Sequence, residues 1–135
     1  MSRVFLDANV LFSAAYRAES GLLSLWGMSG VTLVTSDYAA QEATANLGAP
    51  AQRERLAKLL KRVTVYAHSS NPPALPRSIV LPGKDVPILQ AAITAGATVL
   101  LTGDVTHFGR YYGKTFGGVR ILRPAVFIRE QSGNA

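Results

Sequence analysis

The chain has 135 residues, of which 48% are hydrophobic and 16% are charged. This length and composition fit one domain with a sizeable core, and they exclude a disordered chain or two full domains. The 14 Lys and Arg against 8 Asp and Glu give a formal net charge of +6, which favours a polyanionic partner such as nucleic acid.

Two absences in the sequence narrow the class of protein further. The chain contains no cysteine, which excludes disulfides, thiolate metal ligands and a cysteine nucleophile. Arg3, Asp7 and Arg17 interrupt the apolar N-terminal region before a signal sequence or a membrane span could form. We therefore expect a cytoplasmic protein that has no membrane partner.

Short apolar runs alternate with helical patterns along the chain. In chain order we expect a strand at 4–6, helices at 10–16 and 21–28, a strand at 31–35, a helix at 37–47, a helix opening at Pro50, a strand at 63–66, a helix from Asp85 to Gly96, strands at 98–101 and 119–122, and a helix at 124–129. Ser20, Ser36 and Asp85 are expected to cap the helices that follow them.

The pattern of these elements predicts the fold class. The stretch from Ser69 to Gly83 is rich in proline, which indicates a loop that crosses the surface. Continuously apolar strands separated by helices indicate a parallel sheet that is covered on both faces. We therefore predict an α/β fold with three layers, α/β/α, around a mostly parallel sheet of four to five strands.

Four of the 8 acidic residues stand where such a fold would bring them together. Asp7 and Asp104 follow two apolar strands, and open parallel sheets bind ligands beyond the carboxyl ends of their strands. Glu42 lies one to two turns into the helix after the second strand. Asp85 begins the helix that leads back to the strand before Asp104. Short connections place both of these residues near the same edge of the sheet.

Four carboxylates in one cleft repel one another unless a cation neutralises them, and oxygen ligands suit the hard ions Mg²⁺ and Mn²⁺. Such ions can clamp a phosphodiester and activate the attacking water. We expect Thr102 and Asn9 to orient the carboxylates or their waters. Lys84, Arg110 and Lys114 are expected to hold the nucleic-acid strand through its phosphates.

Four fragments carry these acids in a fixed order. They are Asp-Ala-Asn-Val-Leu from Asp7, Ser-Asp-Tyr-Ala-Ala-Gln-Glu ending at Glu42, Lys-Asp-Val-Pro-Ile-Leu-Gln-Ala-Ala around Asp85, and Leu-Leu-Thr-Gly-Asp-Val-Thr-His-Phe around Asp104. The ordered set resembles the PIN domain, and its spacing is most similar to that of the VapC-type toxins of bacterial and archaeal toxin–antitoxin modules. The resemblance runs from Arg3 to Ile128.

The resemblance implies a Mg²⁺- or Mn²⁺-dependent endoribonuclease in which residues 1–135 form one PIN-like nuclease domain. It also implies a homodimer and a cognate antitoxin that inhibits the enzyme. The four acids take the acidic positions of the family, and Thr102 takes its hydroxyl position. The chain departs from the pattern at two places, because Ala8 stands where many members carry Thr or Ser and His107 stands where a further acid often occurs.

Each of these residues also has a structural interpretation. Asp7 and Asp85 could serve as helix caps and nothing more. Asp104 could be a turn residue, and Glu42 could lie on a solvated helix face. His107 could contact a phosphate, although a lone histidine near a cleft is more often packed or hydrogen-bonded.

Other functions also remain open. The basic helix at 53–62 could be a solvated face or a surface for RNA or antitoxin, and we expect His68 to be structural. One alternative is a phosphotransfer or receiver-type domain with Asp7 as the phosphoryl acceptor. Asn9 argues against one version, because haloacid-dehalogenase-like phosphatases carry a second Asp there. The other alternative is a non-catalytic PIN-like module that binds RNA or protein, which the presence of all four acids disfavours.

Overall fold

A six-stranded sheet forms the centre of the protein in the computed structural model, which describes residues 2–133. The strands are β1 (Ser2–Leu6), β2 (Val31–Ser36), β3 (Thr64–Tyr66), β4 (Val99–Leu101), β5 (Thr115–Phe116) and β6 (Val119–Leu122). The helices are α1 (Ala8–Tyr16), α2 (Asp37–Asn46), α3 (Pro50–Leu60), α4 (Val86–Thr94), α5 (Val105–Phe108) and α6 (Pro124–Gly133), with two 3₁₀ helices, η1 (Gly21–Gly27) and η2 (Gly109–Tyr111).

The strand order is β3-β2-β1-β4-β6-β5, and every pairing is parallel except that of β5 with β6. The predicted α/β fold with a mostly parallel sheet is therefore confirmed, but the predicted four to five strands were too few. The missed strand, β5, has only two residues and turns into β6 through Gly117 and Gly118, whose φ angles are 57° and 83°. Such a turn suits a two-residue hairpin, but two residues are too short a run to show any hydrophobic pattern.

The order in which strands are added to the sheet reverses between β1 and β4. From β1 it adds β2 and β3 on one side, and it then crosses over to add β4 and β6 on the other. Parallel sheets bind ligands in the crevice at such a switch point. The register pairs Leu6 with Leu101, so the residues that follow the two strands emerge side by side at one edge.

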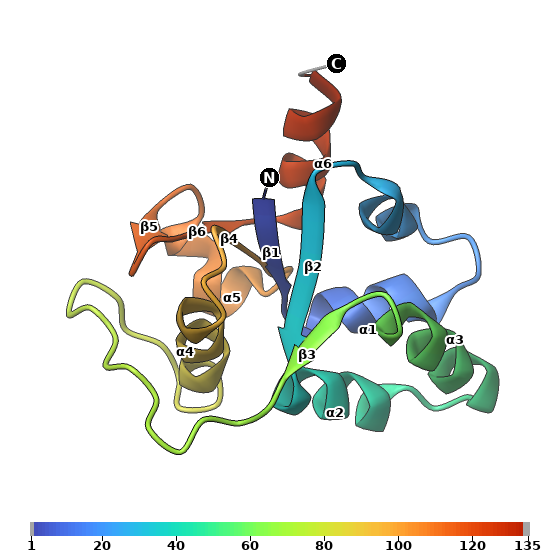
Figure 1. Ribbon diagram of the computed structural model, residues 1–135, viewed down its shortest axis with the longest axis horizontal. Helices are drawn as coiled ribbons and strands as arrows, with labels where there is room; N and C mark the ends of the chain where they lie inside the picture. Colours follow the sequence, from blue (N-terminus) through green and yellow to red (C-terminus); the bar gives the residue numbers. More distant parts are fainter. Residues whose placement is uncertain (1, 134–135) are drawn as a thin grey trace.

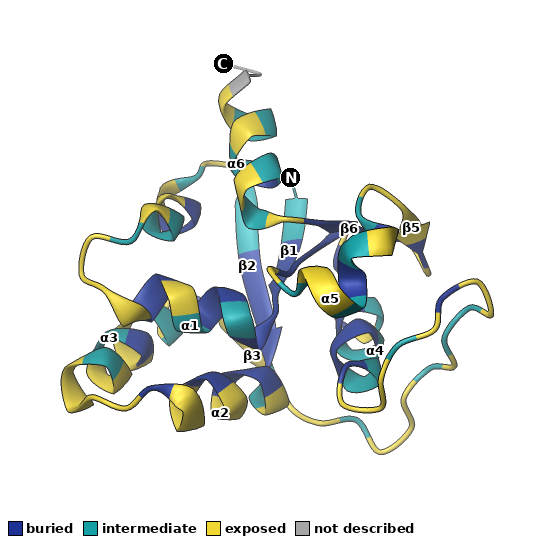
Figure 2. Cartoon of the chain, turned by 180° about the vertical axis from the view of Figure 1, so that it is seen from behind, coloured by how far each residue is buried: buried dark blue, intermediate teal, exposed yellow. Residues whose placement is uncertain are grey.

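Helices cover both faces of the sheet, with α4 on one side and α1 and α3 on the other (Figure 1). The strands are buried, whereas the outer surfaces of α2 and α3 are exposed (Figure 2). Phe5 and Leu100 from neighbouring strands are fully buried, as is Leu89 of α4. Burying a side chain of this size contributes about 1.5–3 kcal/mol, so the apolar strands are the main source of stability.

Two expected caps are confirmed, and the third prediction was wrong. Ser36 Oγ accepts a hydrogen bond from the Ala39 N–H at the start of α2, and Ser20 Oγ accepts one from Leu22 N–H in η1, which is a 3₁₀ helix. Asp85 precedes α4 but makes no capping hydrogen bond. Its backbone has helical angles, φ −97° and ψ −17°, and a capping side chain needs an extended backbone.

Residues 67–85 between β3 and α4 contain neither helix nor strand, as the proline content predicted (Figure 1). The segment brings Lys84 and Asp85 back to the carboxyl edge of the sheet just before α4 begins. Within residues 2–133 no helix has the length and apolar composition needed to cross a membrane.

Candidate active site

A cleft of about 480 Å³ opens at the carboxyl edge of β1 and β4. Its volume lies within the range of about 300–1,000 Å³ that is usual for ligand sites. The cleft is lined by all four predicted acids, Asp7, Glu42, Asp85 and Asp104, together with Asn9 and Lys84 among others. The tertiary structure therefore brings together acids that lie as far apart in the sequence as Asp7 and Asp104.

Asp7 joins β1 to α1 and is almost fully buried, with 4% of its surface exposed. Its backbone N–H donates to the Leu101 carbonyl at 3.1 Å, and its Oδ1 accepts from the Ala8 N–H at 2.7 Å. Asp7 therefore caps α1, which is the structural role considered for it from the sequence, and it also lines the cleft. The capping bond occupies Oδ1, and Oδ2 is held by the side chains of Asn9 in α1 and Thr102 in the loop after β4.

Thr102 connects the loop after β1 with the loop after β4. Its fully buried Oγ1 donates to Asp7 Oδ2 at 2.8 Å and accepts from the Asp104 N–H at 3.2 Å. Asn9 Nδ2 donates to Asp7 Oδ2 at 3.1 Å and to Thr102 Oγ1 at 3.3 Å, and Asn9 Oδ1 accepts from the Gly103 N–H at 2.7 Å. Thr102 and Asn9 therefore contact the Asp7 carboxylate directly.

The carboxylates of the cleft carry an electrostatic penalty. Burial raises the pKa of Asp7 from 3.8 to about 6, because the hydrogen bonds from Thr102 and Ala8 only partly offset the loss of water and the charges of Asp85 and Glu42 add to it. Burial is also the largest cause that raises the pKa of Asp85, where the charge of Asp104 acts in the same direction and His107 opposes it. A bound cation would remove this penalty.

Asp85 and Asp104, which line the cleft, meet His107 at its margin. His107 Nδ1 lies 2.8 Å from Asp85 Oδ2 and 2.7 Å from Asp104 Oδ2. Apart from these ion-pair contacts, Asp85 Oδ2 and His107 Nδ1 are buried and make no hydrogen bond among residues 2–133. Buried, unpartnered oxygen and nitrogen donors that converge in this way fit a divalent cation.

Glu42 and Lys84 form the exposed side of the cleft. Tyr38, four residues before Glu42 on α2, donates from its hydroxyl to the Lys84 carbonyl at 3.1 Å and so ties the loop before α4 to α2. Tyr38 was not singled out in the sequence, although the spacing of four residues places it on the same helix face as Glu42.

The other two residues predicted to bind RNA lie outside the cleft. Arg110 is exposed in η2, with its guanidinium carbon 6.0 Å from the centre of the Tyr111 ring, and Lys114 is exposed in the turn before β5. Neither residue lines the cleft. Of the three predicted basic residues, the structure therefore brings only Lys84 next to the acids.

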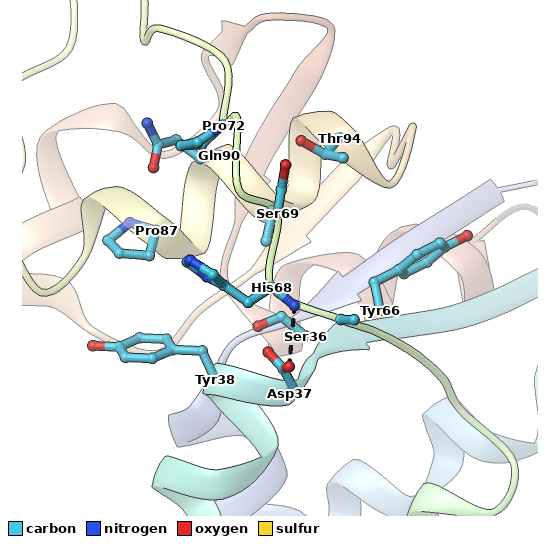
Figure 3. Close-up of a pocket in the computed structure, with 12 residues that line it drawn as sticks. Ser36, Asp37, Tyr38, Tyr66, His68, Ser69, Pro72, Pro87, Gln90 and Thr94 are labelled. Carbon is cyan, nitrogen blue, oxygen red and sulfur yellow. Dashed lines mark hydrogen bonds between the residues drawn. The ribbon is translucent and has the colours of Figure 1, made fainter.

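A smaller cavity of about 50 Å³ lies between α2, α4 and the loop that follows β3 (Figure 3). Tyr38, Tyr66, His68 and Gln90 are among the residues that line it. A bound water needs about 10–15 Å³, so this cavity suits a few waters and not a nucleotide. The backbone N–H of His68 donates to Asp37 Oδ2 at 3.0 Å, which attaches the start of the loop to α2.

Residues 3–106 match the family model of the PIN domain. No match was found among curated proteins. Among solved structures, the chain is similar to one described as VapBC2 from Rickettsia felis bound to a DNA fragment from their promoter, with a TM-score of 0.60 and 14% identity over 90% of this chain and 98% of that one. It is also similar to VapC20 from Mycobacterium tuberculosis, described as a sarcin-ricin loop cleaving toxin, with a TM-score of 0.51 and 17% identity over 75% of this chain and 91% of that one. At these identities the two structures support the fold.

Proposed function

The chain belongs to the PIN-domain family, and on that premise we propose that it is a metal-dependent endoribonuclease that hydrolyses RNA phosphodiester bonds in the acidic cleft. The observation that carries the proposal is the convergence of Asp7, Glu42, Asp85 and Asp104 in one cleft of a chain whose net charge is +6. An acidic cleft repels a polyanion unless cations are bound in it, whereas the basic remainder of the chain attracts one.

Asp7, Asp85 and Asp104 are the residues that we propose hold Mg²⁺ or Mn²⁺ directly, and Glu42 ligates through water or completes a second site. When bound, the ion supplies positive charge to the scissile phosphate and lowers the pKa of the attacking water. Thr102 and Asn9 hold Asp7 Oδ2 in position through hydrogen bonds. Their role is to keep the carboxylate oriented without any rearrangement when the ion binds.

Lys84 is the basic residue best placed to meet the phosphate next to the scissile bond, because it lines the cleft beside Asp85. Its position is set from α2 through the hydrogen bond of Tyr38 to the Lys84 carbonyl. Arg110 and Lys114 lie outside the cleft, where they would meet phosphates further along the RNA strand.

We further propose that the protein is the toxin of a toxin–antitoxin module, with a homodimeric assembly, a cognate antitoxin as partner and a cytoplasmic location. The support is the likeness in fold to the VapBC2 and VapC20 structures, together with the ordered acidic motifs. The neighbouring reading frames test this part of the proposal, because a toxin of this kind should lie beside a small gene for its antitoxin. Co-expression of that gene should abolish the ribonuclease activity.

The catalytic part is tested by RNA cleavage with the purified protein. Cleavage should stop in EDTA, return with Mg²⁺ or Mn²⁺, and be lost in Asp104→Asn. Glu130→Gln is the matched control, since this carboxylate pairs with Arg120 outside the cleft. Undiminished cleavage in EDTA would contradict the proposal.

The same preparations distinguish the two alternative functions. Metal binding or RNA binding without any cleavage would indicate a non-catalytic module. A phosphoaspartate at Asp7 after incubation with acetyl phosphate, detected by mass spectrometry, would indicate phosphotransfer. The geometry disfavours that outcome, because Asp7 is buried and both of its carboxylate oxygens already accept hydrogen bonds.

A further inference from the structure

We propose that His107 is a direct metal ligand in the acidic cleft and that its imidazole makes the site prefer Mn²⁺ over Mg²⁺. This inference rests on the metal site of the proposed function and deepens it, because the four acids alone leave the choice of ion open.

His107 Nδ1 lies close enough to both carboxylates to share one ion with them. Nδ1 lies 2.8 Å from Asp85 Oδ2 and 2.7 Å from Asp104 Oδ2, and one ligand atom from each of the three residues lies within 4.8 Å of the others. Adjacent ligands of an octahedral ion with bonds of about 2.1 Å are about 3.0 Å apart. A small outward shift of the three atoms would therefore admit the ion between them.

The local backbone holds the imidazole at this position. The His107 N–H donates to Asp104 Oδ1 at 3.2 Å, which caps the single turn of α5 and orients Asp104 and His107 toward each other. Phe108, the next residue, is fully buried and anchors α5 to the core. The side chain of His107 is 27% exposed. Burial alone therefore does not force the ring against the carboxylates.

The lack of a hydrogen bond is the observation that favours a metal ligand over a simple contact. Asp85 is 8% exposed, and its Oδ2 is buried without a hydrogen-bond partner in the described part of the chain. His107 Nδ1 is likewise buried and makes no hydrogen bond within residues 2–133. In its neutral form, the imidazole offers a nitrogen lone pair that faces two carboxylates and can bind a cation together with them.

The ligand types decide which cation is favoured. Carboxylates and water suit Mg²⁺ and Mn²⁺ alike, whereas imidazole binds transition-metal ions in preference to Mg²⁺. Adding one nitrogen to an oxygen site therefore raises the affinity for Mn²⁺ more than the affinity for Mg²⁺. The competing arrangement is a protonated His107 that bridges the two carboxylates and occupies the place of the cation. In that arrangement the histidine would compete with the metal instead of binding it.

The test uses metal-free wild-type protein and measures Mn²⁺ binding by electron paramagnetic resonance. Electron spin echo modulation from a bound histidine nitrogen should be present in the wild type and absent in His107→Gln. His68→Gln is the matched control, because the chain contains 2 histidines and His68 lies at the smaller cavity, whereas His107 contacts Asp85 and Asp104. Its nitrogen modulation should equal that of the wild type.

Affinities provide a second measurement, from calorimetric titrations with Mn²⁺ and Mg²⁺. His107→Gln should raise the Kd for Mn²⁺ by about 10-fold or more, with a smaller rise for Mg²⁺. His107→Asp, which makes the site all-oxygen, should bind Mg²⁺ more tightly than the wild type. Far-ultraviolet circular dichroism of each variant checks that it is folded.

Three results would overturn the inference: no nitrogen modulation from Mn²⁺ bound to the wild type, tighter Mn²⁺ binding by His107→Gln, or no binding of Mn²⁺ at all. These outcomes are distinguishable from failure of the proposed function. RNA cleavage without nitrogen modulation would overturn only the role of His107, and nitrogen modulation without RNA cleavage would overturn only the ribonuclease.

Discussion

Thr102 Oγ1 donates a 2.8 Å hydrogen bond to Asp7 Oδ2, and this bond joins the carboxyl ends of the neighbouring strands β4 and β1. The same hydroxyl accepts the Asp104 N–H at 3.2 Å. The Thr102 and Asp7 side chains are buried, at 0% and 4% exposure, so water has little access to the bond between them. One hydroxyl therefore links two acids of the cleft.

Thr102→Val is expected to destabilise the protein, because it keeps the shape of the side chain and removes the hydroxyl. Leaving Asp7 Oδ2 and the Asp104 N–H without this partner should cost about 1–3 kcal/mol of unfolding free energy. Urea denaturation measures the change. Thr102→Ser retains the hydroxyl and is the control. A Val variant as stable as the wild type would show that the bond is unimportant.

Asp7 is expected to make the stability of the metal-free protein depend on pH. Its folded pKa of about 6 lies above the ordinary 3.8, so the folded state binds the proton more tightly than the unfolded state. The resulting stabilisation is complete below about pH 4 and is lost as the pH rises through about 6, with a magnitude of about 3 kcal/mol.

The variant Asp7→Asn isolates this dependence, because an asparagine side chain does not ionise in this pH range. In EDTA, the unfolding free energy of the variant should increase relative to that of the wild type as the pH rises from 3 to 8. In saturating Mg²⁺ the wild type should instead gain above pH 6, because the ion binds the ionised carboxylate. Parallel pH curves for the two proteins in EDTA would contradict the raised pKa.

Asp85→Asn is expected to abolish cleavage while raising the melting temperature of the metal-free protein. Asp85 makes no capping bond that the change could break, and the raised pKa of Asp85 shows that its charge is unfavourable in the folded state. Removing that charge should contribute about 1 kcal/mol, or a few degrees in a domain of this size.

Excess Mg²⁺ should erase or reverse this difference, since only the wild type gains the full stabilisation from binding the ion. Thermal scans of both proteins in EDTA and in Mg²⁺ measure the effect. A variant that melts below the wild type in EDTA would show that the Asp85 carboxylate stabilises the fold.

The affinity for RNA is expected to fall steeply with salt, and Lys84→Ala should lower the slope of log K against log salt by about 0.7–1. Arg110→Ala and Lys114→Ala should each have an effect of the same size if these residues meet phosphates. Arg129→Ala is the control, because Arg129 is exposed in α6 and does not line the cleft. An unchanged slope for Lys84→Ala would mean that the RNA does not pass through the cleft.

Local patterns were sufficient to predict most of the elements and the group of acids. Val4, Phe5 and Leu6 form an apolar run that needs burial on both faces, and such a run can only be a central strand once helices separate it from the next one. The position of Asp7 directly after that run places it at the carboxyl edge in any parallel sheet. The sequence by itself therefore determined the fold class and the edge at which the chemistry lies.

The tertiary structure decided how the side chains at that edge meet. The contact between His107 and Asp85 joins a one-turn helix to a residue 22 positions earlier in the chain, and no pattern in either segment indicates it. Asp85 was expected to cap α4, but it makes no capping bond and its side chain contacts His107 of α5 instead. Which strands become neighbours, and in which register, depends on packing between elements that are distant in the sequence. Hydrophobic periodicity describes only how one element is buried, so it carries no information about the partner that covers it.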